Sequence, residues 1–123
     1  MAPLQYVILR HEGIAEPHFD LMFETLPGSE LATWQVDLWP IVSRTALTRL
    51  KDHRRVYLDY EGPLTRHRGS VRQMARGTCQ VEIGEGAVWT IRFLNGTVGS
   101  LVIRQVEAEK WEAVPLVVRP CDG

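Results

Sequence analysis

The sequence predicts an all-β fold, mainly antiparallel, that forms a small closed β-barrel of about eight strands with at most one or two short helices. Short runs rich in valine, isoleucine and aromatic residues recur along the whole chain, as in antiparallel strands. Glycine, proline and asparagine separate these runs at short intervals, which indicates tight turns. Because 123 residues suffice for one core but not for two, we expect a single domain over residues 1–123.

The first half of the chain contains three clear strands and two less regular segments. The clear strands are expected at residues 6–9, 18–26 and 32–36. Residues 43–51 fit two structures, because Leu47 and Leu50 are spaced as on one helical turn. Thr45, Leu47 and Arg49 equally alternate as on a strand. A further strand is expected at residues 56–60, where the following Gly-Pro pair ends it.

The second half of the chain shows a more regular succession of strands and turns. Five strands are expected here, at residues 70–75, 78–83, 87–94, 98–105 and 111–118. Glycine-containing breaks separate them, at Arg76-Gly77, Gly84-Glu85-Gly86 and Asn95-Gly96. The Asn-Gly pair is a strong signal for a type I′ hairpin. A barrel suits this many short strands, because closure removes exposed sheet edges.

The composition is typical of a globular protein, with 45% hydrophobic and 24% charged residues. Two cysteines, Cys79 and Cys121, match no metal motif and are too few for a disulfide framework. The first residues do not resemble a signal peptide, and no apolar run has the length of a membrane span. We therefore expect a cytoplasmic protein that does not associate with a membrane.

The net charge of the chain is −1, but residues 44–76 form a locally basic segment. Three acidic residues, Asp52, Asp59 and Glu61, lie within this segment. Its basic residues are nine of the 14 in the chain: Arg44, Arg49, Lys51, Arg54, Arg55, Arg66, Arg68, Arg72 and Arg76. Such a segment is suited to phosphate or nucleic acid, although an ordinary solvated surface can also produce it.

Two histidines and an aspartate form the strongest candidate site. Along the second strand, His18 and Asp20 share one face with Met22 and Glu24, while three apolar residues share the other. A short loop separates this strand from His11, so a hairpin can bring all three polar side chains together. Two imidazoles and one carboxylate with open positions are typical of a catalytic metal site. The alternative is a pair of solvated histidines beside an ordinary polar residue.

A second polar cluster lies at residues 52–62. If the chain is extended from Arg55 onward, Arg55, Tyr57 and Asp59 share one face, and His53 lies at the strand entrance on the side of Tyr57. An imidazole and a tyrosine hydroxyl can both donate hydrogen bonds to a phosphate oxygen. The alternative is a tyrosine at the edge of the core and a solvated histidine.

In their order and spacing, these clusters resemble the 3′-phosphoesterase domain family of bacterial DNA ligase D, the ligase of non-homologous end joining. That family carries a motif of the form His-x5-His-x-Asp-x-Arg-x-Glu, and later Asp-His-x3-Tyr followed by an acidic-aromatic-Glu-Gly step. The residues that resemble these motifs here are His11, His18, Asp20, Met22 and Glu24, then Asp52, His53, Tyr57 and residues 59–62. Weaker likenesses extend the resemblance over roughly residues 6 to 115, at Trp34, residues 68–71, 76–78 and 99–102, and Trp111.

The resemblance implies a small β-barrel and a stand-alone, divergent member of that family. The implied activity is a manganese-dependent hydrolase of DNA repair that removes a 3′-terminal phosphate or ribonucleotide. His11, His18 and Asp20 would then bind Mn²⁺, while Zn²⁺ or another divalent metal also suits such ligands. His53 and Tyr57 would be the catalytic, phosphate-binding residues. The implied partners are DNA or DNA/RNA 3′ ends and other end-joining repair proteins.

Two departures from the family motif affect this interpretation. The loop between His11 and His18 is one residue longer, which a loop absorbs at little cost. Met22 stands where the family has a phosphate-binding arginine, and a thioether cannot replace a guanidinium there. Another arginine must then bind phosphate, and the candidates are Arg44, Arg55 and Arg68, with Arg10 and Arg54 also near the motifs.

Two other functions therefore remain open. The first alternative, which Met22 motivates, is a non-catalytic relative that binds a metal or DNA ends. A ferrous oxygenase is the second alternative, and it would use His18 and Asp20 with His53 or His67, without His11.

Overall fold

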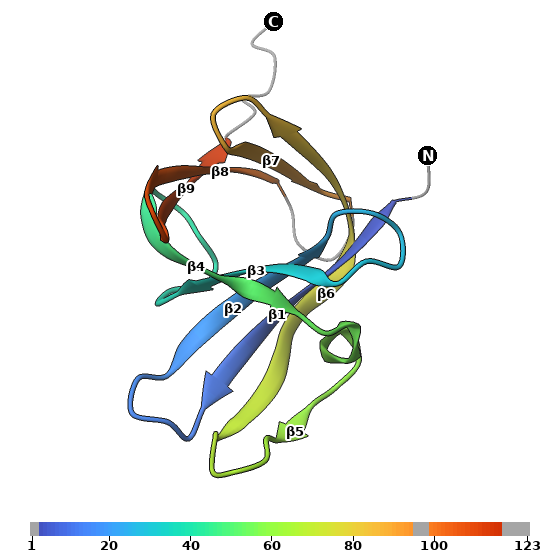
Figure 1. Ribbon diagram of the computed structural model, residues 1–123, viewed down its shortest axis with the longest axis vertical. Helices are drawn as coiled ribbons and strands as arrows, with labels where there is room; N and C mark the ends of the chain where they lie inside the picture. Colours follow the sequence, from blue (N-terminus) through green and yellow to red (C-terminus); the bar gives the residue numbers. More distant parts are fainter. Residues whose placement is uncertain (1–2, 95–98, 117–123) are drawn as a thin grey trace, which may run out of the picture.

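The computed structural model describes residues 3–94 and 99–116, and these residues form strands almost throughout (Figure 1). A single short 3₁₀ helix, η1 (Arg55–Leu58), interrupts them within the described residues. The strands in chain order are β1 (Leu4–Glu12), β2 (His18–Glu24), β3 (Leu31–Val36), β4 (Thr45–His53), β5 (Gly62–Pro63), β6 (Ser70–Gly84), β7 (Val88–Phe93), β8 (Ser100–Glu107) and β9 (Lys110–Leu116).

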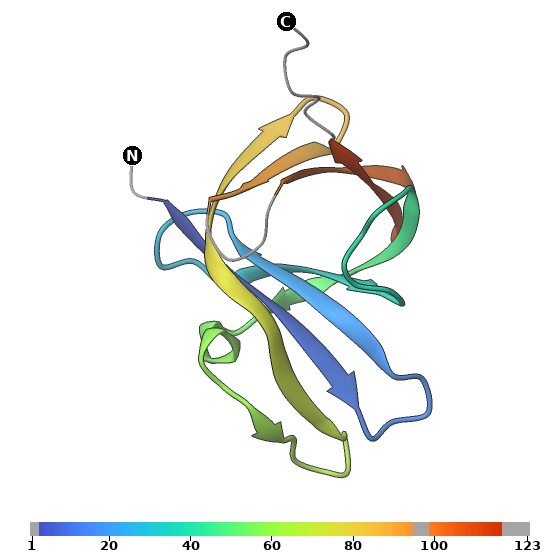
Figure 2. The same ribbon diagram turned by 180° about the vertical axis from the view of Figure 1, so that it is seen from behind.

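Eight of these strands close into an antiparallel barrel. The sheet runs in the order β1-β2-β3-β4-β9-β8-β7-β6, and a further β1–β6 pairing joins its two ends. The short strand β5 pairs with the first two residues of β6, Ser70 and Val71. Figure 2 shows β6 following β1 along the back of the molecule before it continues into the upper ring of strands. The predicted all-β, antiparallel barrel of about eight strands is confirmed.

Two local predictions are decided by long-range pairing. The ambiguous segment is strand β4, because Leu47 is buried in the barrel. The break predicted at Arg76-Gly77 is wrong, since both residues stay in the ladder opposite Val7 and Tyr6 of β1 and β6 continues through them. The hairpin turn predicted at 95–96, the first residue of the strand predicted at 98–105 and the last residues of the strand predicted at 111–118 lie outside the described residues.

The strand predicted at residues 56–60 is also wrong. This segment forms η1, in which the Tyr57 amide donates to Arg54 O at 3.2 Å and the Asp59 amide donates to Val56 O at 3.1 Å. The helical turn directs Leu58, which is 2% exposed, onto the outer face of β1 and β2. An extended chain would place alternate residues on opposite faces and could not make the same fit.

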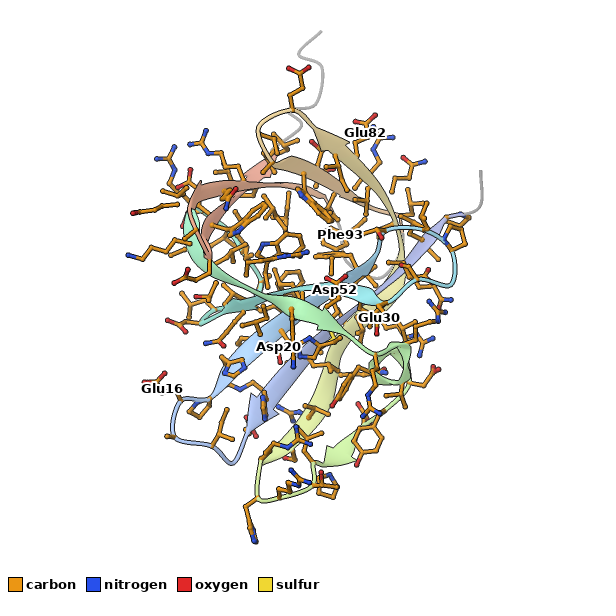
Figure 3. All side chains as sticks on the ribbon, viewed as in Figure 1. Glu16, Asp20, Glu30, Asp52, Glu82 and Phe93 are labelled. Atoms are coloured by element: carbon orange, nitrogen blue, oxygen red, sulfur yellow. The ribbon has the colours of Figure 1, made fainter. Side chains whose placement is uncertain are left out.

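Two apolar clusters lie on opposite faces of β1 and β2. The barrel core fills the interior, where the Trp34 ring lies 4.9 Å from that of Trp89 and 5.4 Å from that of Trp111. Figure 3 shows Phe93 inside this ring of strands and Asp20 below it. The second group, here called the outer cluster, consists of Val7, Leu9, Met22, Leu31, Leu58 and Val71.

Among the described residues, no helix has the length and apolar character needed to cross a bilayer.

Candidate metal centre

The β1–β2 hairpin brings the predicted metal ligands together. His11 and His18 are direct partners in the antiparallel register, and Asp20 lies opposite Leu9. The two imidazole rings meet edge to face with centroids 5.0 Å apart. One ligand atom from each of His11, His18 and Asp20 lies within 4.8 Å of the other two. The geometry therefore assembles the three residues that the sequence indicated.

Backbone carbonyls fix which nitrogen of each imidazole is available. His11 Nε2 lies 2.7 Å from Arg68 O, and His18 Nδ1 lies 2.9 Å from Glu16 O. Because a carbonyl oxygen only accepts, each of these nitrogens carries the proton of the neutral ring. The lone pairs are then left on His11 Nδ1 and His18 Nε2. This carbonyl-to-histidine support is the usual arrangement behind a metal-binding imidazole.

Both lone pairs face the buried carboxylate of Asp20. Its Oδ2 lies 3.9 Å from His11 Nδ1, and its Oδ1 lies 3.3 Å from His18 Nε2. The Asp20 side chain is 6% exposed, and Oδ1 accepts no hydrogen bond of normal geometry from the described residues. Buried acceptors that face one another need a proton or a cation between them. The donor set therefore fits a divalent cation, with positions left for water or substrate.

The pKa of His18 reflects the same arrangement. The Asp20 carboxylate beside the ring raises this pKa, and the Glu16 carbonyl adds to the effect. Burial acts in the opposite direction but is outweighed. Without a metal, His18 therefore holds a proton more readily than an ordinary histidine, as expected where a positive charge is favoured.

His53 and Tyr57 form a second group on β4 and η1. Their rings lie 5.7 Å apart, and Tyr57 packs against the outer cluster. His53 Nδ1 lies 2.9 Å from Lys51 O, which leaves its Nε2 free in the neutral ring. The Tyr57 hydroxyl makes no hydrogen bond within the described part of the chain. His53 Nε2 and the Tyr57 hydroxyl are thus available to a ligand. The tyrosine lies on η1, not on a strand as the sequence predicted.

The position that carries arginine in the ligase D family is buried here. Met22 is 1% exposed and packs in the outer cluster, to which Leu58 of η1 also belongs. The two hydrophobic side chains leave no solvated opening for a guanidinium at this point. A phosphate contact therefore has to come from another part of the chain.

The three arginines predicted to bind phosphate have different surroundings. Arg55 is held by Glu24, with which its Nη1 forms an ion pair, and it also donates to Ser29 O at 2.9 Å. Arg44 is exposed and lies 3.9 Å from Glu112 at the β4–β9 side of the barrel. Arg68 alone of the three contacts the metal ligands, through its carbonyl on His11.

Glu24 forms a buried anchor on the same face of β2. Its side chain is 2% exposed and accepts backbone hydrogen bonds from Gln5 at 2.6 Å and Gly28 at 2.9 Å. Burial by itself raises the pKa of this carboxyl, but the Arg55 contact and these two amides hold the pKa below its usual range. The Arg55–Glu24 ion pair connects η1 to β2. Arg55, one of the arginines predicted to bind phosphate, is therefore already paired within the protein.

An open groove of about 240 Å³ lies beside Arg68. Sequence reasoning did not identify this groove, because its walls come from η1 and from the connections on both sides of β5. The lining residues are Arg54, Val56, Tyr57, Tyr60, Pro63, Leu64, Thr65 and Arg68. A second groove, of about 310 Å³, lies elsewhere, between Trp39 and Phe93, and no titratable side chain lines it.

The metal group contains His11, which the oxygenase alternative excluded. Within the described residues, neither His53 nor His67 joins His18 and Asp20 in a group of potential ligands. His67 lies on the exposed connection between β5 and β6. The geometry therefore favours the ligand set of the phosphoesterase-like interpretation over that of a ferrous oxygenase.

No protein-family model matches this chain, and no curated protein matches it.

Proposed function

We propose that this protein is a divalent-metal-dependent phosphoesterase that acts on the 3′ ends of DNA or DNA/RNA strands in repair. The observation that carries the proposal is the convergence of His11 Nδ1, His18 Nε2 and Asp20 on one point. When bound there, a divalent ion such as Mn²⁺ or Zn²⁺ would supply charge neutralisation for a phosphate oxygen and a site for water.

The chain itself would contribute hydrogen-bond donors to the phosphate. His53 Nε2, when protonated, and the unpaired Tyr57 hydroxyl are suited to hold phosphate oxygens. A protonated His53 is also suited to pass a proton to the leaving oxygen. Arg68, whose carbonyl contacts His11 and whose guanidinium is held by Thr65, is the candidate to supply the positive charge that the arginine replaced by Met22 would have given. We place the reaction in the cytoplasm, beside other end-joining repair proteins.

A nuclease-free assay tests this proposal directly. Metal-stripped protein is supplied with MnCl₂ and a primer-template that ends in a 3′-phosphate or in a 3′ ribonucleotide. We expect release of phosphate or of the nucleoside, loss of activity in His18→Ala, and about 100-fold slower turnover in His53→Ala. Glu82→Gln, which changes an exposed carboxylate on β6, is the control and should retain full activity. Absence of release with Mn²⁺, Zn²⁺ and Fe²⁺ alike contradicts a phosphoesterase.

A non-catalytic metal- or DNA-end-binding protein is the second candidate, and the burial of Met22 favours it. An enzyme that has lost its main phosphate-binding arginine can retain a binding site while losing transition-state stabilisation. Binding of the same primer-template with no product after prolonged incubation would select this candidate over the first.

A further inference from the structure

The groove beside Arg68 combines apolar walls with aromatic rings. Tyr57 and Tyr60 contribute rings, and Val56, Pro63 and Leu64 contribute aliphatic surface. The Tyr60 hydroxyl donates to Pro63 O, so its ring is held in place while the hydroxyl is occupied. A volume of about 240 Å³ lies below that of a pocket for a drug-sized ligand and suits one small planar group.

Two arginines line the groove. Arg54 lines it, and the Arg54 guanidinium makes no hydrogen bond or ion pair with the described residues. The Arg68 guanidinium lines it too and is held by Thr65, through 3.0 Å contacts to the carbonyl and to Oγ1. The described residues of the lining include no acidic side chain; of the acids in the same segment, Asp59 pairs with Arg76, and Glu61 accepts a hydrogen bond from the Gln73 amide. The groove therefore favours an anionic ligand with a flat apolar part.

A rigid contact fixes the groove relative to the metal centre. Gly69, at φ +79°, packs so closely that a Cβ there would lie 2.0 Å from Glu12 O. The preceding residue, Arg68, presents its carbonyl to His11 at 2.7 Å. The connection between β5 and β6 is thus locked onto the β1–β2 hairpin, and one residue, Arg68, belongs to both the groove and the support of the metal ligands.

We infer that this groove binds an unpaired nucleobase of the strand whose 3′ end lies at the metal centre. The inference rests on the proposed function and adds to it that the substrate end is single-stranded or frayed. Tyrosine rings interleaved with arginines are the usual means of holding single-stranded nucleic acid, since every base can stack and every phosphate is an anion. A base inside an intact duplex cannot enter such a groove, because both of its faces are already stacked.

Binding of a short oligonucleotide tests the inference apart from hydrolysis. The probe is a single-stranded DNA hexamer with 2-aminopurine at its 3′ nucleotide and a 3′-hydroxyl, so that no terminal phosphate can be released. It is titrated with Mn²⁺-loaded protein. We expect Arg54→Ala and Tyr60→Leu each to weaken binding by about tenfold. Arg54→Ala should also lower the slope of log K against log salt concentration by about 0.7.

Matched controls separate the groove from general effects. Tyr60→Phe keeps the ring but loses the hydrogen bond to Pro63 O, and it should bind more tightly than Tyr60→Leu. Arg92→Ala removes an exposed arginine from β7 and should leave binding unchanged. A blunt duplex of the same sequence should bind more weakly than the single strand. Unchanged affinity in both Arg54→Ala and Tyr60→Leu, or equal affinity for the duplex, overturns the inference.

The two proposals fail in different ways. Groove-dependent binding without hydrolysis of a 3′-phosphate substrate refutes the phosphoesterase and supports the base-binding groove. Hydrolysis that is normal in Arg54→Ala and Tyr60→Leu, together with unchanged hexamer binding, refutes the groove and leaves the phosphoesterase standing.

Discussion

The two faces of the β1–β2 hairpin are stabilised in different ways. The inner face packs Tyr6, Ile8 and Phe23 into the barrel core, where apolar contacts dominate. The outer face has a smaller apolar cluster around Met22, flanked by the metal group at one end of β2 and by Glu24 at the other. The stability of the inner face therefore depends on the volume and burial of apolar side chains. The stability of the outer face depends in addition on polar groups that need specific partners.

This difference explains why the candidate site lies outside the barrel. Large aromatic side chains, among them Trp34 and Trp89, fill the interior. The outer face keeps its polar residues usable, because backbone carbonyls hold each histidine in one tautomer without covering its second nitrogen. Substitutions on the two faces should consequently change the free energy of unfolding by different amounts. These changes should also depend differently on metal and on pH.

The largest effect is expected inside the barrel. Trp34→Ala should lower the free energy of unfolding by about 3–5 kcal/mol, because Trp34 is fully buried and contacts two other tryptophans. Urea denaturation monitored by circular dichroism measures the change. Val42→Ala, at a position 80% exposed, is the control and should stay within about 0.5 kcal/mol of the wild type. Equal effects at the two positions contradict the assigned core.

Met22→Arg tests whether the outer cluster can accept the arginine of the ligase D family. We expect a loss of about 3 kcal/mol in the free energy of unfolding, because the position is 1% exposed and the guanidinium would be buried among the apolar side chains of the outer cluster. Met22→Leu, which conserves volume, should cost less than about 1.5 kcal/mol. A stable Met22→Arg protein with faster phosphate release would show instead that η1 moves aside.

Metal binding should stabilise the folded protein through the three ligands on the outer face of the hairpin. At a Mn²⁺ concentration about 100 times Kd, the free energy of unfolding should rise by about 2.7 kcal/mol, because only the folded hairpin brings the three ligands together. Asp20→Asn should abolish this increase, while Glu82→Gln should retain it. Thermal unfolding with and without MnCl₂ gives the result, and an equal increase in the Asp20→Asn protein would exclude Asp20 as a ligand.

A smaller effect with a defined pH dependence is expected at Glu24. Its pKa lies below the usual value of 4.5, so the stability it contributes is present above pH 4.5 and is lost as the pH falls through the folded-state pKa. Glu24→Gln should cost about 2 kcal/mol at pH 7 and progressively less in acid. Asp59→Asn, which removes an exposed ion pair, should cost less than about 1 kcal/mol. A pH-independent effect of Glu24→Gln would contradict a charged Glu24.

The parts of the fold that follow from local periodicity were predictable from sequence. Alternation along β2 correctly placed His18 and Asp20 on the face opposite the barrel core, and the loop after His11 correctly indicated a hairpin. The same reasoning failed at residues 56–60, because a strand and a 3₁₀ turn differ little in local preference. There, the burial of Leu58 and the Arg55–Glu24 pair decide the conformation.

By itself, the sequence determined the antiparallel strands, their inward and outward faces and the three candidate metal ligands, since strand alternation and turn residues are local properties. Tertiary structure alone decided which partners these residues have. The Arg68 carbonyl reaches His11 across 57 positions, and Arg55 reaches Glu24 across 31. Such contacts depend on how connections pack over the finished barrel, so no local pattern encodes them. The same packing buries Met22 and creates the groove beside the metal centre.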